Sequence, residues 1–166
     1  MHYRSQLMFI ITFIGATLLA FSCGKTDDTS ASSMAQQIQD LQHQLDNVRP
    51  GIGDIMMGIQ EHHAKLWFAG INRNWKLGEF ELDEIEENVE KIEALYPHDS
   101  RSQKLSMIDE PLDSLRASIE AHKMKQFKNR FSVLTQTCNN CHRENGYEFN
   151  VIKIPDQPPV PNQRFN

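Results

Sequence analysis

Cysteine is scarce in this sequence, with three residues in 166, and this scarcity limits the kinds of site that the chain can build. Two of the three form a Cys-x-x-Cys pair at Cys138 and Cys141, and no second such pair exists to complete a zinc site. The histidines His62 and His63 could complete one only if they folded onto the cysteine pair. A dithiol redox motif normally opens a helix after a strand, and we find no such setting. A plain disulfide between the two is a further alternative.

The sequence also lacks the alternation of apolar and polar residues that marks a half-buried strand. The best strand candidate is the segment 149–154, but it leads directly into a cluster of prolines at positions 155, 158, 159 and 161. We therefore interpret 148–166 as an extended, proline-rich C-terminal tail that lies over the rest of the chain. The expected fold class is all-α.

Positive charge is not in excess, because 17 Lys and Arg residues face 22 Asp and Glu residues, for a formal net charge of −5. An acidic balance argues against nucleic acid as a partner and against direct binding to anionic lipid. It is compatible with a basic redox partner protein.

The N-terminal residues 1–22 have the composition of a secretory signal peptide: Arg4, then an uncharged apolar run, then small residues. The run is short for a membrane span. Cys23 follows at once, in a setting that resembles a bacterial lipoprotein box, and we expect it to be lipidated, with 23–33 as a flexible tether. The alternative is a free or disulfide-bonded cysteine. The chain is expected to be exported, periplasmic or anchored to the outer membrane, with membrane contact only through the lipid.

The stretch Cys138-Asn139-Asn140-Cys141-His142 has the pattern that attaches a c-type haem. Two thiols at this spacing lie near one face of a helical turn, where they can form thioether bonds to the two vinyl groups of one porphyrin. His142 then offers a neutral imidazole nitrogen to the iron as the proximal axial ligand. We expect one covalently bound haem c.

Apolar residues recur at three- and four-residue steps in several segments, which predicts amphipathic helices joined by short connections. A helix over 34–49 precedes the main domain and could pack on it or on a second copy in a homodimer. Within 50–147 the pattern predicts an antiparallel up-down four-helix bundle. Its expected helices cover 52–75, 80–96, 109–122 and a last segment from about 124, with a break at Leu77-Gly78 and a loop or single turn over 101–107.

The last helix places the haem motif in the domain. Its apolar stripe continues through both cysteines, at steps of four, three, four and three residues: Phe127, Phe131, Leu134, Cys138 and Cys141. The porphyrin is therefore expected to project into the core between the helices.

The opposite side of the haem is expected to face the helix that begins at Ile52. On a helical wheel, Met56 and His63 lie within its apolar stripe, whereas His62 lies at the edge. Both Met sulfur and His imidazole can be the sixth ligand of haem iron. His63 is the preferred candidate and Met56 the alternative, although each could also be an ordinary core residue. Gly70 would allow close approach of a neighbouring helix or of the porphyrin.

A helical bundle with Cys-x-x-Cys-His near the end of its last helix resembles the cytochrome c-prime family and its low-spin relatives, over about 52–146. The stretches His63–Gly70 and Asn74–Leu77, with the tail Pro158–Gln163, resemble a subset of bacterial cytochrome c-type proteins. The resemblance implies haem on Cys138, Cys141 and His142. It also implies a sixth ligand from the first bundle helix, often a methionine, which points to Met56 or Met57, or a five-coordinate iron that binds small gases.

Several classes of function remain open. The first is an electron carrier of the cell envelope, which works with a redox partner protein. The second is a five-coordinate haem module that binds or senses NO or CO. A third is an anchored interaction protein. An enzyme is not expected, because no paired acid and base accompanies His63.

Overall fold

The computed structural model describes residues 26–166, and the expected signal peptide and the lipidation of Cys23 lie outside them. All secondary structure in this part of the chain is helical, with no strand, which confirms the predicted all-α class. The helices are α2 (Thr26–Val48), α3 (Ile52–Ile71), α4 (Trp75–Leu95), the 3-10 helix η1 (Ser102–Ile108), α5 (Asp109–Glu120) and α6 (Met124–Glu144).

Helix α2 is a separate unit, because the contacts of the chain divide after Arg49. It begins at Thr26, so residues 26–33 of the expected tether are helical. The side chains of its apolar stripe are 51–76% exposed: Met34, Ile38, Leu41, Leu45 and Val48. Pairing of this stripe with a second copy of the chain stays a prediction.

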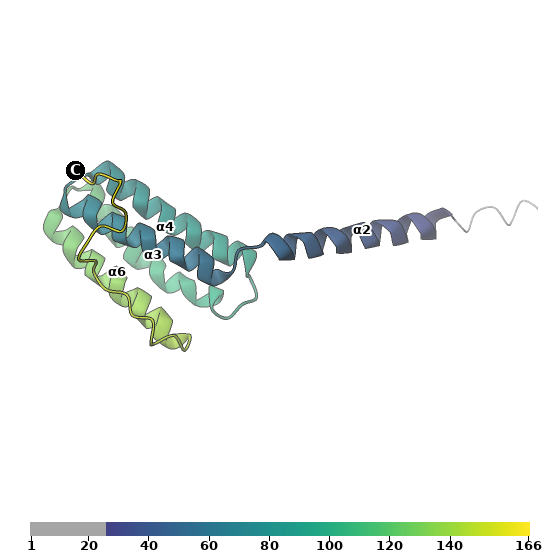
Figure 1. Ribbon diagram of the computed structural model, residues 1–166. Helices are drawn as coiled ribbons and strands as arrows, with labels where there is room; N and C mark the ends of the chain where they lie inside the picture. The colour runs from purple at the N-terminus through teal and green to yellow at the C-terminus, as the bar shows by residue number, and fades with distance from the viewer. Residues whose placement is uncertain (1–25) are drawn as a thin grey trace, which may run out of the picture. The chain divides into compact units, whose positions relative to one another are not determined.

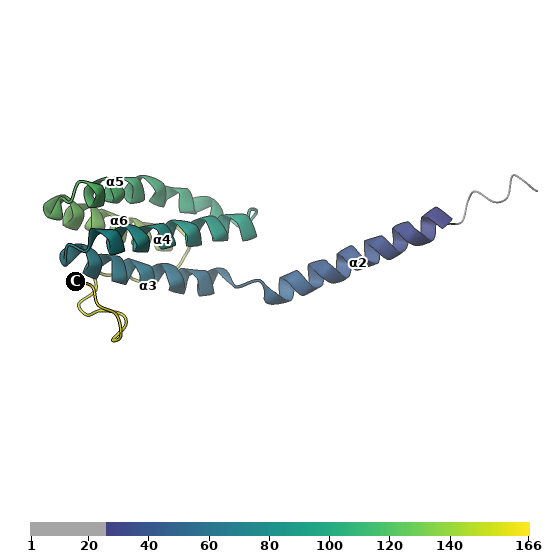
Figure 2. The ribbon, with the colours of Figure 1, turned by 90° about the horizontal axis from the view of Figure 1, so that it is seen from above.

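The second unit, Pro50–Asn166, contains the other helices, which pack side by side (Figures 1 and 2). Helix α3 contacts α4 and α6, and α5 contacts α4 and α6. Each helix contributes the apolar face that its sequence spacing predicts. The fully buried residues of this core include Leu66, Leu82, Ile85, Ile92, Leu115, Phe127 and Phe131.

The turn between α3 and α4 lies earlier than predicted. Helix α3 ends at Ile71, because Arg73 adopts a left-handed conformation with φ of 61° and the next residue bonds back to the carbonyl of Ala69. Asn74 then caps α4 by accepting a hydrogen bond from the Leu77 amide at 3.3 Å. The predicted break at Leu77-Gly78 is therefore wrong, and Gly78 is a buried residue inside α4.

Gly70 of α3 is buried in the aromatic part of the core, next to a side chain of α6. A Cβ atom at this position would lie 2.0 Å from Cζ of Phe127, a residue of α6. The prediction that Gly70 permits close approach of a neighbouring helix is confirmed, and the approaching group is the Phe127 ring. Trp67, Phe131 and Trp75 surround that ring, with centroids 5.9–6.1 Å away.

Residues 147–166, here called the C-terminal strap, follow α6 without forming a strand (Figure 1). Asn139 of α6 bonds both backbone groups of Ile152 in the strap. Farther along, Phe165 is buried with its ring 5.7 Å from that of Phe68. The strap is thus fixed at two separated points to α6 and α3, as expected for an extended arm.

Candidate functional site

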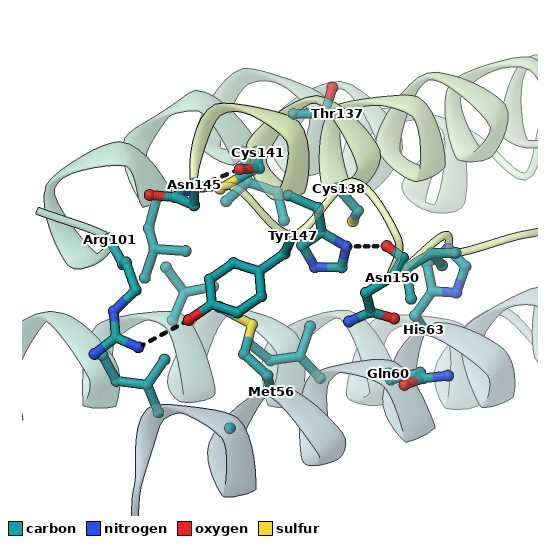
Figure 3. A pocket seen from close by; sticks show the side chains of 18 of the residues that line it. Met56, Gln60, His63, Arg101, Thr137, Cys138, Cys141, Asn145, Tyr147 and Asn150 are labelled. Atoms are coloured by element: carbon teal, nitrogen blue, oxygen red, sulfur yellow. Dashed lines mark hydrogen bonds between the residues drawn. The ribbon is translucent and has the colours of Figure 1, made fainter.

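A cavity of about 280 Å³ lies between α3, α6, η1 and the start of the C-terminal strap (Figure 3). The three residues of the predicted haem motif that carry chemistry all border it. Apolar side chains from α3, α4 and η1 form much of the remaining wall: Ile52, Met56, Ile59, Val89, Leu105 and Ile108. A cavity with an apolar wall and few polar groups is typical of a cofactor or ligand site.

Cys138 and Cys141 project from α6 into this cavity, as the apolar spacing of the helix predicts. Both are partly buried and both are free, so they form no disulfide in this structure. Burial raises the pKa of the Cys138 thiol to about 12 and also raises the pKa of Cys141. The two sulfurs are therefore neutral thiols at physiological pH.

The surroundings of the two thiols bear on the other interpretations of the motif. Dithiol exchange uses a thiolate, whose formation is favoured by a lowered pKa, whereas burial raises the pKa of both thiols. Within residues 26–166, no group of three or more His, Cys, Asp or Glu side chains is arranged to hold a metal ion. Neither alternative finds support in the surroundings of Cys138 and Cys141.

His142 is held in one orientation by the strap. Its Nδ1 lies 2.6 Å from the backbone carbonyl oxygen of Asn150. A carbonyl can only accept, so Nδ1 carries the proton and donates. The neutral ring then keeps its lone pair on Nε2, which is the nitrogen available to a metal. Metal-bound imidazoles commonly have this arrangement: one ring nitrogen binds the metal, and the N–H of the other donates to a backbone carbonyl.

His63 is buried in the wall of the cavity, with 4% of its surface exposed. Its Nε2 lies 2.9 Å from the hydroxyl oxygen of Thr135, and that hydroxyl lies 2.9 Å from the Phe131 carbonyl. The hydroxyl has one proton and gives it to the carbonyl, so it accepts from Nε2–H of His63. Nδ1 is then the ring nitrogen with the lone pair. Burial lowers the pKa of His63 to about 4.

Met56 lines the same cavity from α3 and is partly buried against the core. In Figure 3 its side chain rises from α3 toward the helix that carries Cys138 and Cys141, whereas His63 lies farther along α3. The structure thus brings both predicted sixth-ligand candidates to the cavity that the cysteines border.

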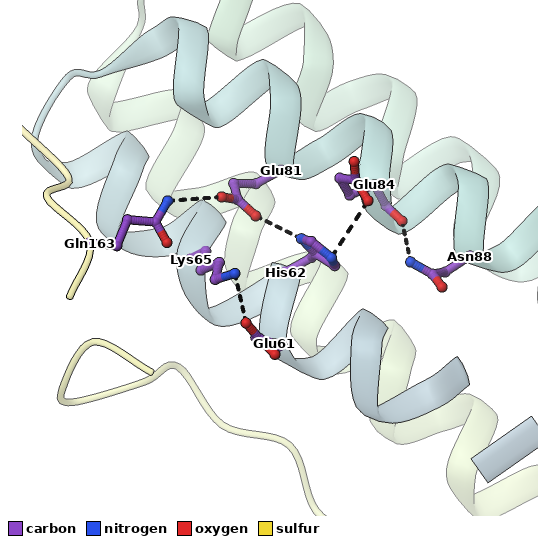
Figure 4. Close-up of polar contacts among 7 residues, drawn as sticks. All are labelled: Glu61, His62, Lys65, Glu81, Glu84, Asn88 and Gln163. Carbon is purple, nitrogen blue, oxygen red and sulfur yellow. Dashed lines mark hydrogen bonds and ion pairs between the residues drawn. The ribbon is translucent and has the colours of Figure 1, made fainter. Parts of the chain in front are cut away.

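His62 faces away from the cavity. Its Nδ1 lies 2.7 Å from a carboxylate oxygen of Glu81, and its Nε2 lies 3.6 Å from Glu84 (Figure 4). Glu81 is 1% exposed and also accepts a 3.5 Å hydrogen bond from Gln163 of the strap. His62 therefore belongs to a polar contact between α3, α4 and the strap, in agreement with its place at the edge of the apolar stripe.

Arg101 adds a fixed positive charge to the cavity wall, and its sequence position alone does not indicate this role. Its guanidinium is paired with Asp99 at 2.7 Å and donates to the Tyr147 hydroxyl at 3.3 Å. These bonds raise the pKa of Arg101 and lower that of Asp99 to about 2. Tyr147 and Asn150 also line the cavity, and Thr135 bonds His63 in its wall. Only three-dimensional proximity identifies these three residues.

Comparison with protein-family models, curated proteins and solved structures finds no match for this chain. Among the helices of the described part, none is both long and apolar enough to cross a membrane.

Proposed function

We propose that this chain is a c-type cytochrome that carries one covalently attached haem and transfers electrons in the bacterial cell envelope. The observation that carries the proposal is the shared cavity. Two neutral thiols and an imidazole with its Nε2 lone pair free border one apolar space, at the spacing typical of haem attachment. The fold that we propose for Pro50–Asn166 is a cytochrome c-prime-like four-helix bundle.

In this proposal each group of the wall has a task. Cys138 and Cys141 hold the porphyrin through thioether bonds, and Nε2 of His142 binds its iron. Arg101, whose guanidinium is bonded to Asp99 and to the Tyr147 hydroxyl, lines the cavity and would offer a positive charge to a propionate. The haem supplies one-electron chemistry between Fe(II) and Fe(III), and the protein tunes it through ligand identity and burial.

Covalent attachment gives the first test. The mature protein, produced with a c-type haem attachment system, should have a Soret band and a mass increased by one haem. Replacing both Cys138 and Cys141 by serine should abolish covalent haem, because no thioether can form. Val133→Ser, at an exposed position of the same helix, should leave covalent haem attachment unchanged. A wild-type protein with neither Soret band nor haem mass contradicts the proposal.

The sixth ligand decides between an electron carrier and a gas-binding module. His63 has its Nε2–H bonded to Thr135, and its other nitrogen is the one with the lone pair. Ligation through Nε2 of His63 would break the bond to Thr135, whereas the Met56 thioether, a weak hydrogen-bond acceptor, lines the cavity and would bind iron without breaking such a bond. We therefore favour Met56 as the sixth ligand and regard His63 as a support of the wall.

The spin state of the haem tests this assignment. Met56→Leu keeps the volume of the side chain but removes the sulfur, so a low-spin spectrum should become high-spin. His63→Gln should remain low-spin, since glutamine can still donate to Thr135. Low-spin Met56→Leu combined with high-spin His63→Gln would instead identify His63 as the ligand. Ultraviolet-visible spectra in both oxidation states give the answer.

The apolar wall supports the second candidate, a five-coordinate haem that binds NO or CO. Ile52, Ile59 and Val89 offer no hydrogen-bond donor or acceptor to a bound gas, which suits a small apolar ligand. This candidate predicts that the wild-type ferrous haem is high-spin and that its spectrum changes when CO is added. A wild-type spectrum that is low-spin and unaffected by CO excludes it.

Export, lipidation at Cys23 and a basic redox partner belong to the same proposal. The net charge of −5 suits a partner of opposite charge, because opposite charges increase the rate of encounter. The exposed apolar stripe of α2 is compatible with a homodimer. Membrane contact would occur only through the lipid.

A further inference from the structure

Asn139 is one of the two variable residues inside the haem motif, and it makes two hydrogen bonds to the C-terminal strap. Its Nδ2 donates to the Ile152 carbonyl at 2.8 Å, and its Oδ1 accepts from the Ile152 amide at 2.7 Å. The side chain thus bonds to both backbone groups of one residue. An extended segment held in this way is fixed in register, because sliding by one residue would break both bonds.

The register of the strap decides which carbonyl reaches His142. Asn150 lies two residues before Ile152, and its carbonyl oxygen accepts from Nδ1–H of His142. On the other side, the Tyr147 amide donates to the His142 carbonyl at 2.8 Å, and the Asn150 amide donates to the Tyr147 carbonyl at 2.9 Å. The loop between His142 and Ile152 is therefore closed at both ends.

We propose that Asn139 is a positioning residue for His142, which acts by holding the C-terminal strap in the register that places the Asn150 carbonyl on Nδ1. The adjacent Asn140 has a different task. It is exposed and accepts a hydrogen bond from Arg143 within the same helix, with no bond to the strap. The two asparagines of the motif thus differ in what they contact.

This inference rests on the proposed function, and it deepens the account of the proximal side. A hydrogen bond from Nδ1–H to a carbonyl makes the imidazole a more basic ligand. A more basic ligand stabilises Fe(III) relative to Fe(II) and lowers the reduction potential. Loss of the Asn139 contact should release the Asn150 carbonyl, weaken this effect and raise the potential.

The test compares Asn139→Ala with Asn140→Ala in the haem-loaded protein. Mutation of a residue that bonds a metal-bound histidine typically changes metal affinity or activity by about 10- to 100-fold. We expect Asn139→Ala to shift the Fe(III)/Fe(II) equilibrium about tenfold toward Fe(II), which is about 59 mV for one electron. Hydrogen exchange at the Ile152 amide should accelerate in the same variant. Asn140→Ala should change neither quantity.

A second variant protects the test from failed haem attachment, since Asn139 lies inside the motif. Ile152→Pro removes the amide that donates to Asn139 and leaves the motif untouched. It should raise the potential in the same direction. If haem-loaded Asn139→Ala or Ile152→Pro protein has the wild-type reduction potential, the positioning role of Asn139 is overturned and the proposed function is not affected. Absence of covalent haem in the wild type overturns the proposed function and this inference with it.

Discussion

Replacing Gly70 by alanine should cost about 3 kcal/mol of unfolding free energy, the upper part of the range for an overpacked core. The added Cβ would lie 2.0 Å from Cζ of Phe127 and within 2.6 Å of two further ring atoms. Phe127 is fully buried, and its ring has aromatic neighbours in Trp67, Phe131 and Trp75, so it has little room to move. The helix propensity of alanine recovers only about 1 kcal/mol.

The measurement is thermal or urea unfolding followed by circular dichroism, and the midpoint should fall by about 10 °C. Gly53→Ala is a matched control, because it makes the same change in the same helix where nothing lies within 4 Å of the new Cβ. It should be neutral or slightly stabilising. In a Phe127→Leu background, Gly70→Ala should lower the unfolding free energy by less, because the ring that the new Cβ would meet is absent. A Gly70→Ala protein as stable as Gly53→Ala would show that the two helices can separate without cost.

The second large effect is a loss of stability in acid that depends on His63. Its pKa falls from 6.5 to about 4 on folding, because burial disfavours the imidazolium. Between these values the unfolded chain binds a proton that the folded chain does not, so stability decreases as the pH falls. A shift of 2.5 units at about 1.4 kcal/mol each corresponds to about 3 kcal/mol. This contribution is fully present above about pH 6.5 and fully lost below about pH 4.

Comparison of His63→Gln with the wild type isolates this contribution. Glutamine does not titrate and can still donate to Thr135. The unfolding free energy of the His63→Gln protein should therefore change less between pH 7.5 and pH 4.5 than that of the wild type. The wild type should lose about 2.5 kcal/mol more over that interval, because the interval ends above the folded-state pKa. His98→Gln, at an exposed imidazole, controls for removing a histidine elsewhere. Parallel pH profiles for the wild type and His63→Gln would mean that His63 becomes protonated without cost in the fold.

The helices of the second unit follow from local spacing, and the predicted starts at 52, 109 and about 124 agree with the structure, whereas the predicted turn between α3 and α4 does not. Periodicity indicates which residues face the core, and Phe127, Phe131 and Leu134 are buried as predicted. It does not indicate where a turn closes. The α3–α4 turn depends on Arg73 in a left-handed conformation and on the cap from Asn74, so the Leu77-Gly78 pair, a typical breaker, continues the helix instead. A local signal was outweighed there by packing around the buried Gly78.

For the site, the sequence identifies the residues that share a helix. Cys138, Cys141 and His142 are close in sequence, and their spacing is itself the signal. The residues that orient the two histidines of the site lie 8 and 72 positions from them: Asn150 bonds His142, and Thr135 bonds His63. Such pairs have no periodic pattern in one sequence, and they become visible only once the strap and the helices are placed in space.

The C-terminal strap also makes one side of the cavity a segment without helix. Residues 147–152 supply that side, and the strap is bonded to α6 at Asn139, while Phe165 farther along packs against Phe68 of α3. The contacts among α3, α4, α5 and α6 are made by the helices themselves. Local opening of the strap would therefore expose the cavity at a lower free-energy cost than unfolding of the helices.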